Sequence, residues 1–493
     1  MQGTHPTRRK GSRSTGAASS HGSRAPDDRA VPPTPDRLHP HPERTALTVW
    51  EDLPNRPFWL ISLILGHLVL GLLPKGSFLG TLHALGTLGG SLLVVLLARR
   101  PVVALYASAY ITGAEVFWRM ISAGVFHEYG KYAVCLVLIA GLIKHGQVRF
   151  PILQVVYFLC LVPGVFMTLY GYEWYTSRRL TSQNLSGPVA LLICSIYCQG
   201  MTINKREMCH LLLALLLPLS VAALYVLKSM QISTIEWSNE SNSSLSGGFG
   251  PNQVSAMLGL GAFAAVWFCF LTSSLVVRVF MGGLCLWLLG QSALTFSRTG
   301  IYLVVGSSLA SGAILMRNPR IRRIFAMSLT ALVLFGALVI YPVLNNFTEG
   351  RLAARFSETQ LSNRGEIASV DLTIWERHLI LGVGIGQAKF ERGRLMGEEA
   401  AAHTEYTRLL AEHGLLGLAA MFLLVFSPLW NLLNQRKTGQ ALCAGFVAWS
   451  LAFMLASAMR LAGPSVLLGL SFAKLSLEDP VVPKRPSTLR SRI

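Results

Sequence analysis

The chain has 493 residues, of which 52% are hydrophobic and only 14% are charged. A soluble chain usually has about 25% charged residues, so this composition excludes an ordinary soluble enzyme. The formal net charge is +19, but the basic residues gather in the two ends of the chain and in alternate short connections, which is typical of membrane insertion and argues against a nucleic-acid partner.

Residues 1–54 are rich in Ser, Gly, Pro, His and Arg and contain few large apolar side chains. Such a segment buries too little apolar surface to offset the entropy of ordering, so we expect a disordered, basic, cytoplasmic tail. No apolar run occurs in the first roughly 30 residues, which argues against a signal peptide. The tail either contacts anionic lipid or only sets the topology.

Long apolar runs follow the tail. A membrane-spanning helix needs roughly 20 predominantly apolar residues. Candidate segments lie at 57–74, 79–98, 101–124, 131–145, 151–170, 187–203, 209–229, 252–272, 277–296, 301–316, 324–342, 414–434, 440–458 and 461–475. Because some of these could merge or lie in the interface, we predict an all-α polytopic membrane protein with about 12–14 transmembrane helices.

The basic connections indicate the orientation of the chain. Lys and Arg are retained on the cytoplasmic side of a membrane, and the connections 99–100, 205–206, 317–323 and 436–437 all fall on one side of the predicted bundle. We therefore expect a multi-pass protein of the bacterial inner membrane with both termini cytoplasmic. The predicted parts are the tail 1–54, transmembrane helices in 55–342, a periplasmic loop with helices at 343–413, transmembrane helices in 414–475, and a cytoplasmic tail at 476–493.

The eight cysteines all lie in or beside apolar runs, and none is in the long loop. This placement predicts small buried hydrophobic side chains and not a disulfide framework. Cys194 and Cys198 are one helical turn apart, which would allow a metal pair, but no His or carboxylate nearby completes a ligand set.

The loop 343–413 alternates helical and glycine-rich stretches. Residues 365–379 place Ile367, Val370, Ile374 and Trp375 near one helical face, which predicts an amphipathic helix on the membrane or capping the bundle. The glycines of GVGIGQ at 382–387 predict a tight loop. A nucleotide-binding role is excluded because no strand precedes the glycines and no βαβ unit is present.

The first candidates for chemistry are cationic residues at the outer membrane boundary. Arg298 lies in TFSRTG at the end of the 277–296 segment. An Arg at membrane depth costs about 2.5–3.5 kcal/mol on insertion scales, so it usually has a partner or a ligand. The alternative is snorkelling to the interface. Arg364 and His403 lie where the long loop should meet the helices, whereas most of its other charges should form a solvated, salt-bridged surface.

The stretch 401–418 should run from the loop into the next spanning helix. Helical spacing would place His403, Tyr406 and Leu410 on one stripe. A His at the outer mouth of a helix can act as a base near neutral pH, although a structural histidine is the alternative.

Weaker candidates lie elsewhere on the outer side. Asn252, in GGFGPNQ, begins a helix and either contacts a sugar or pyrophosphate or caps that helix. Arg178 lies in an outside loop among Tyr and Trp residues, which suits sugars and phosphates but also an interfacial belt. Glu115 and Arg119 are one turn apart in a spanning segment and should form a structural ion pair.

Four motifs together carry a family resemblance. These are the SRTG turn after a spanning helix, the NRGE of the long loop, GVGIGQ, and HTEYTRLLAEHGLLGL entering a helix. In this order they resemble the bacterial O-antigen ligase family, whose superfamily also holds Wzy-type O-antigen polymerases and protein O-oligosaccharyltransferases. The likeness covers roughly residues 245–435 and is strongest at 295–300 and 361–418. Many relatives have Asn where this chain has Thr404, which bears on a capping or orienting role.

The resemblance implies a GT-C-like glycosyltransferase that needs no metal and no cofactor. Its donor would be O-antigen on undecaprenyl pyrophosphate, and its acceptor would be a sugar hydroxyl of the lipid A core. Direct attack by that hydroxyl would invert the anomeric centre. The enzyme would also contact membrane lipids. Catalytic roles fall on His403, Arg298 and Arg364, and weaker substrate-binding roles on Asn252, Tyr406, Arg351, Arg355 and Arg178. Independently, the outside segments contain no Asp-x-Asp, and Asp371 is the only Asp in the long loop.

Two alternatives remain. A Wzy-type polymerase uses the same donor with a lipid-linked glycan as acceptor. A lipid-linked glycan transporter or flippase belongs to another class, which tends to show duplicated halves and broken helices near the bilayer midplane; neither is evident in this sequence.

Overall fold

The computed structural model describes residues 52–146, 148–230, 243–316, 333–357 and 364–478, with isolated positions at 323, 326, 327 and 330. Within this part the chain is helical apart from one short pair of strands. The tail predicted at 1–54 lies outside the described residues up to position 51. The end of the chain from 479 and part of the predicted segment 324–342 also lie outside them.

The helices follow the predicted apolar runs. In chain order the elements are η1 (Leu53–Asn55), α2 (Pro57–Leu68), η2 (Val69–Leu72), α3 (Phe78–Leu97), α4 (Val102–Met120), α5 (Tyr129–His145), α6 (Ile152–Gly171), α7 (Trp174–Cys198), β1 (Thr202–Asn204), α8 (Lys205–Ser229), η4 (Ser244–Ser246), α9 (Pro251–Leu271), α10 (Leu275–Leu294), α11 (Thr299–Leu315), η5 (Gly336–Ile340), α13 (Tyr341–Phe347), α14 (Arg351–Ser357), α15 (Arg364–Arg377), α16 (Ala388–Met396), α17 (Glu405–Leu433), α18 (Lys437–Ser457), α19 (Ala462–Leu470) and β2 (Lys474–Ser476). Each predicted segment outside 324–342 overlaps a helix, but some bounds differ: α7 begins at Trp174, before the predicted segment 187–203, and α19 ends at Leu470, before the end of the predicted segment 461–475.

Seven helices in the described part are long and apolar enough to cross a membrane, namely α3, α6, α8, α9, α10, α17 and α18. The protein is therefore an all-α, multi-pass membrane protein. Shorter apolar helices are present as well, and the total of about 12–14 crossings stays a prediction.

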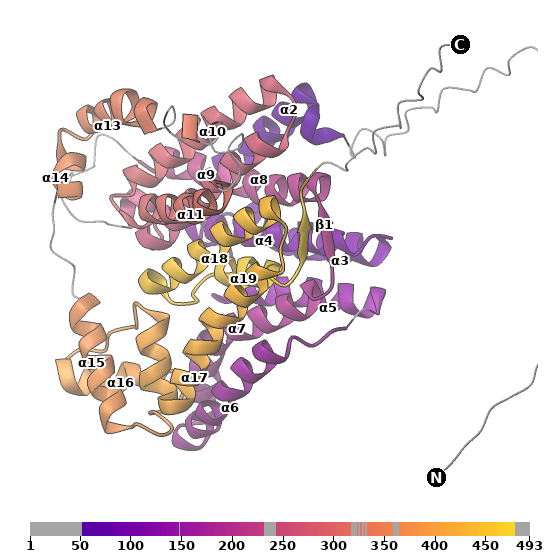
Figure 1. Cartoon of the computed structure of the whole chain (residues 1–493). Helices are drawn as coiled ribbons and strands as arrows, with labels where there is room; N and C mark the ends of the chain where they lie inside the picture. Colours follow the sequence, from indigo (N-terminus) through magenta and orange to yellow (C-terminus); the bar gives the residue numbers. More distant parts are fainter. Residues whose placement is uncertain are drawn as a thin grey trace, which may run out of the picture. The chain divides into compact units, whose positions relative to one another are not determined.

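Burial separates the inner helices from those that face lipid. The most apolar windows of α8 and α9 are 78% and 83% buried, whereas those of α3 and α6 are only 17% and 28% buried. α8 packs against α4 and α9, α9 packs against α10 and α11, and α11 packs against α18 (Figure 1). Apolar side chains exposed over whole helices, as on α3, indicate contact with lipid chains.

The two short strands lie together although they are far apart in sequence. β1 pairs with β2 in parallel, with Thr202 opposite Lys474. The Gln435 side chain supports β2, because its Oε1 accepts a hydrogen bond from Leu475 N at 2.9 Å. The connection after α7 and the segment after α19 are thus fixed at one end of the bundle.

The connection 343–413 contains helices, and they form two groups. α13 contacts α10 and α14, whereas α15 and α16 contact each other and α17 (Figure 1). The predicted amphipathic helix 365–379 corresponds to α15, which buries Ile367 and Ile374.

α17 begins earlier than the predicted segment 414–434 because the chain bends at Gly414. This residue has φ 61° and ψ −132° inside the helix, and Leu415 N donates instead to Leu379 O at 2.8 Å. A Cβ at Gly414 would lie 2.5 Å from Leu379 O, so only glycine fits. The first part of α17, residues 405–413, is therefore held next to the end of α15, and the two helices pack together.

The glycine-rich stretch 382–387 forms the tight loop that the sequence predicts. Gly382, Gly384 and Gly386 all have positive φ. The loop runs along α17, since Val383 N donates to Ala411 O and Gly384 N donates to Glu412 O, both at 3.0 Å. The loop thereby holds α15 and α16 against the first part of α17.

Candidate functional site

His403 lies immediately before α17. Thr404 is the N-cap, and its hydroxyl accepts a hydrogen bond from Tyr406 N at 3.1 Å. The prediction that His403, Tyr406 and Leu410 share one helical stripe is therefore wrong, because His403 precedes the helix. Thr404 satisfies an otherwise unpaired N–H as an Asn would, so the capping role survives the substitution.

Cationic side chains surround His403. Its imidazole is half-buried. Burial lowers its pKa from 6.5, and the positive charges of Arg460, Arg364 and Arg392 lower it further, to about 4. Two residues predicted from the sequence, His403 and Arg364, thus lie within electrostatic reach of each other. At neutral pH the imidazole is uncharged and can accept a proton.

Arg460 is a site residue that the sequence reasoning missed. It lies in the connection 458–462 between α18 and α19, and its Nη2 donates to Ala402 O at 2.7 Å. Among the described residues it forms no ion pair with a carboxylate. Burial and the nearby Arg392 and Arg408 lower its pKa, so an anion beside Arg460 would be stabilised. The signal in the sequence was an Arg between two apolar segments, which is a functional-site pattern.

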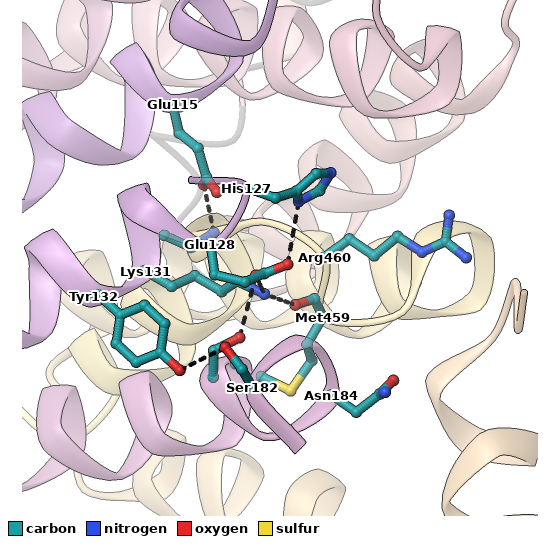
Figure 2. Close-up of polar contacts among 12 residues, drawn as sticks. Glu115, His127, Glu128, Lys131, Tyr132, Ser182, Asn184, Met459 and Arg460 are labelled. Carbon is teal, nitrogen blue, oxygen red and sulfur yellow. Dashed lines mark hydrogen bonds and ion pairs between the residues drawn. The ribbon is translucent and has the colours of Figure 1, made fainter. Parts of the chain in front are cut away.

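The backbone of the connection 458–462 is strained and firmly held. Ala458 has φ 47° and ψ −160°, a conformation that non-glycine residues rarely adopt and that is often found at functional sites. Its N–H donates to His403 O at 3.2 Å. Charged side chains of α4 and α5 fix the rest of the connection (Figure 2). These bonds are Lys131 Nζ to Met459 O at 3.3 Å, Arg119 Nη2 to Arg460 O at 3.1 Å, and Ala462 N to Glu115 Oε2 at 2.7 Å.

Glu128 completes this network at the start of α5. It pairs with Lys131 and accepts hydrogen bonds from Ser186 Oγ at 3.2 Å and from His127 Nδ1 at 3.1 Å (Figure 2). Burial alone would raise the pKa of Glu128, but the His127 hydrogen bond and the Lys131 ammonium outweigh it and lower the pKa to about 2. Glu128 is therefore ionised and stabilises the Lys131 charge beneath the connection.

The first turns of α17 carry a buried charge triad. Arg408 donates through Nη1 to Glu412 Oε2 at 2.7 Å and through Nε to Glu405 Oε2 at 3.1 Å. Glu405 Oε2 also accepts from Met459 N at 3.3 Å, which ties α17 to the connection 458–462. The expectation of a solvated, salt-bridged surface is wrong here, since all three side chains are buried.

A second buried pair joins three helices of the loop region. Arg392 of α16 donates through Nε to Asp371 Oδ1 of α15 at 2.7 Å, and Thr407 Oγ1 of α17 donates to Asp371 Oδ2 at 2.8 Å. Arg392 Nη1 also donates to Ala400 O. The pair therefore fixes the segment that leads to His403.

The TFSRTG motif forms a turn between α10 and α11 with Arg298 at the N-cap of α11. Asn252 Oδ1 accepts from Ser297 Oγ at 2.8 Å and from Thr299 Oγ1 at 3.3 Å. The N-cap of its own helix is Gly250, so the capping interpretation of Asn252 is wrong. Arg298 is half-buried, and within the described residues it is not among the charges that lower the pKa of His403.

The weaker candidates have varied positions. Tyr406 Oη donates to Leu451 O at 2.8 Å and so ties α17 to α18. Arg178 is exposed on α7, which begins at Trp174, so its placement in a loop is wrong. Arg351 is exposed at the start of α14, and the side chain of Arg355 lies outside the described part.

The cysteines and the side chains that could bind a metal ion are the remaining groups with possible chemistry. All eight cysteines are free; Cys160 and Cys269 are half-buried, and the others are buried. Within the described ranges, no three His, Cys, Asp or Glu side chains form a group that could hold a metal ion.

Residues 283–422 match the family model for O-antigen ligase, Wzy_C. The matched segment runs from α10 into α17 and includes Arg298, Arg364 and His403, whereas Arg119 and Arg460 lie outside it. A search of curated proteins and a search of solved structures gave no match.

Proposed function

This chain belongs to the O-antigen ligase family through residues 283–422, and from that premise we propose that it is an O-antigen ligase. It transfers polysaccharide from undecaprenyl pyrophosphate to a sugar hydroxyl of the lipid A core, on the periplasmic side of the bacterial inner membrane. Both termini are cytoplasmic, and the enzyme is GT-C-like. The observation that carries the proposal is the neutral His403 among Arg460, Arg364 and Arg392.

The reaction is a single displacement. The acceptor hydroxyl oxygen attacks the anomeric carbon of the donor sugar and forms the new glycosidic bond. The bond from that carbon to the pyrophosphate oxygen breaks, and the electron pair leaves with undecaprenyl pyrophosphate. His403 accepts the hydroxyl proton. Attack opposite the leaving group inverts the anomeric centre.

The arginines stabilise the leaving group. The pyrophosphate gains negative charge as its bond to the sugar breaks, and a guanidinium offers a fixed charge and hydrogen-bond donors suited to phosphate oxygens. Arg460 supports this role most directly, because it forms no ion pair in the described part of the chain. Arg364 and Arg298 are proposed to act with it, and no metal ion is required.

Donor binding and proton transfer are coupled in this arrangement. Burial and the same cations that are proposed to bind the pyrophosphate lower the pKa of His403 to about 4, which makes it a weak base. A bound pyrophosphate offsets their charge and raises the pKa of His403 toward its ordinary value, which makes it a better base. The base therefore becomes effective when the donor is in place.

A gene deletion separates ligase from polymerase. For a ligase, the deletion strain loses long-chain O-antigen on lipid A but still makes the lipid-linked polymer. Accumulation of lipid A core that carries a single repeat would instead identify a polymerase. Transfer of labelled glycan from undecaprenyl pyrophosphate to lipid A core by purified protein in detergent, without vesicles, would exclude transport as the primary role.

A further inference from the structure

A cavity with a largely aromatic lining lies next to the connection 458–462, on the side of α4 and α5. Its volume is about 330 Å³, and it lies where α4 ends and α5 begins, with Phe249 from the segment before α9 on its wall. Aromatic side chains make up much of the lining, namely Trp118, Phe126, Tyr129 and Phe249.

Arg119 is the unexplained group of this cavity. Its side chain is only 9% exposed. Nη2 donates to Glu115 Oε1 at 2.6 Å and to Arg460 O at 3.1 Å, but Nε and Nη1 are buried and have no hydrogen-bond partner among the described residues. Buried donors are almost always paired, so two such donors on one guanidinium call for an acceptor beyond the described part of the chain.

The other buried polar groups on the lining are already engaged, whereas Ser122 and His127 are exposed. Trp118 Nε1 donates to His83 Nδ1 at 2.9 Å, and Tyr129 Oη donates to Ala84 O at 2.9 Å. Both oxygens of Glu115 accept hydrogen bonds, from Arg119 and from Ala462 N. The aromatic rings therefore contribute apolar faces, and Arg119 contributes the buried donors that remain.

The geometry of Arg119 favours an oxyanion. The Phe249 ring lies over the guanidinium, 5.3 Å from Cζ to the ring centroid. This cation–π contact supplies no acceptor oxygen, so Nε and Nη1 remain for phosphate or carboxylate oxygens. A charged acceptor forms stronger bonds there than a neutral hydroxyl.

The cavity is linked to His403 through one short connection. Arg119 donates to the backbone carbonyl of Arg460, and the Arg460 side chain donates to the carbonyl of Ala402, next to His403. A ligand at Arg119 would therefore lie on the far side of the connection 458–462 from the proposed base.

We propose that this cavity binds an acidic saccharide unit, with its phosphate or carboxylate at Arg119 and its ring against Phe126 and Phe249. The proposal rests on the ligase function, which supplies the glycan substrates that such a subsite would bind. The oxyanion belongs either to a phosphorylated sugar of the lipid A core or to a uronic acid of the O-antigen.

Calorimetric binding to the purified full-length protein in detergent tests the proposal. One pair of probes is a delipidated core oligosaccharide with its phosphates and the same oligosaccharide after phosphatase treatment. The other pair is an oligosaccharide ending in glucuronic acid and its carboxyl-reduced counterpart. We expect at least one acidic probe to bind about tenfold or more tightly than its neutral counterpart. The preferred pair identifies the acceptor or the donor glycan as the source.

Variants of Arg119 and Phe126 test whether the preference for the acidic probe arises in this cavity. Arg119→Gln should remove the preference for the acidic probe, and Arg119→Lys should keep part of it. Arg119 also supports the connection 458–462, so Phe126→Ala is the second variant. Phe126 is 59% exposed, so its truncation leaves the core packed and should weaken the acidic and neutral probes by the same factor, about threefold to tenfold. The control is Arg394→Gln, an exposed arginine outside the cavity.

Equal binding of acidic and neutral probes by the wild-type protein would overturn the proposal, as would a preference that persists in folded Arg119→Gln. The readout does not depend on transfer. If the preference is present and transfer to lipid A core is absent, the ligase function fails while the acidic saccharide site stands. If transfer occurs and no preference is found, the site fails and the ligase function stands.

Discussion

Replacing Arg460 by Gln removes the cation that the structure places beside His403 without an ion-pair partner in the described part. The change removes a charge-assisted contact to the leaving pyrophosphate. A preorganised donor aimed at developing charge is worth about 3–4 kcal/mol, so kcat should fall by about a hundredfold to a thousandfold. The structural loss is smaller, because Arg460 makes one side-chain hydrogen bond, to Ala402 O, worth about 1 kcal/mol.

The pH dependence gives a second readout of the same variant. A base loses activity as the pH falls through its pKa, so the acid limb of kcat/KM for the wild-type enzyme should follow a pKa of about 4 for His403. Removal of the Arg460 charge raises that pKa, so the acid limb should move to higher pH. Arg460→Lys keeps the charge and should leave the limb in place, while it loses part of kcat.

The assay is transfer of labelled glycan to lipid A core by purified protein over a range of pH. Arg394→Gln is the matched control, because this side chain is 72% exposed and its ion pair with Glu391 contributes little; kcat should stay within about threefold of wild type. Wild-type kcat together with an unmoved acid limb in folded Arg460→Gln would refute the role of Arg460.

Three further changes test the scaffold and the chemistry. Gly414→Ala should lower the free energy of unfolding by about 2–3 kcal/mol and lower Tm, because φ is positive and the new Cβ meets Leu379 O. The control Gly397→Ala, at a position with φ 82° and open space around it, should lower it by about 1 kcal/mol. Equal losses in the two variants would contradict the close contact at Gly414. Asp371→Asn leaves Arg392 as an uncompensated buried charge and should lower the free energy of unfolding by about 3–5 kcal/mol. The control Glu399→Gln removes an exposed ion pair and should lower it by at most about 1 kcal/mol. A loss of stability in Asp371→Asn as small as that in the control would contradict this reasoning. Transfer should continue in EDTA, and a strict need for added Mg²⁺ or Mn²⁺ would exclude the metal-independent mechanism.

Composition and apolar run length were enough to predict most of the fold. A spanning helix is specified locally, because each turn must be apolar wherever lipid surrounds it. For that reason the predicted runs and the helices overlap. The predicted spanning segment begins at Gly414, where α17 is kinked and Leu415 N donates to Leu379 O. The kink was not predicted, because a contact between separate segments leaves no local pattern.

The site was predictable only in part, for a similar reason. His403 and Arg364 were predicted because family motifs mark them, and the structure places Arg364 within electrostatic reach of His403. The positions of Arg460 and Arg119 depend on the fold of the connection 458–462, which gathers α4, α5, α17 and α18. Arg119 resembled an ordinary i,i+4 ion pair in the sequence, and that pair is present. That two of its nitrogens have no partner in the described part of the chain is evident only once the surrounding helices are in place.

The buried charges of the connection 343–413 show most clearly what could not be predicted from the sequence. Asp371 of α15 and Arg392 of α16 were expected to be solvated surface residues, because the connection that contains both helices carries many charges. Both are buried, since α15, α16 and α17 meet at this point. A paired charge can replace an apolar contact in such a position, and sequence periodicity does not reveal it.

The most direct test of the account compares single-turnover transfer by the wild-type protein and by His403→Ala, from undecaprenyl pyrophosphate-linked glycan to lipid A core in detergent. We predict that the wild-type protein transfers the glycan and that folded His403→Ala loses at least about a hundredfold in rate, as expected for a general base. Transfer by His403→Ala at a rate within about threefold of wild type would contradict the central claim that His403 accepts the proton from the attacking hydroxyl.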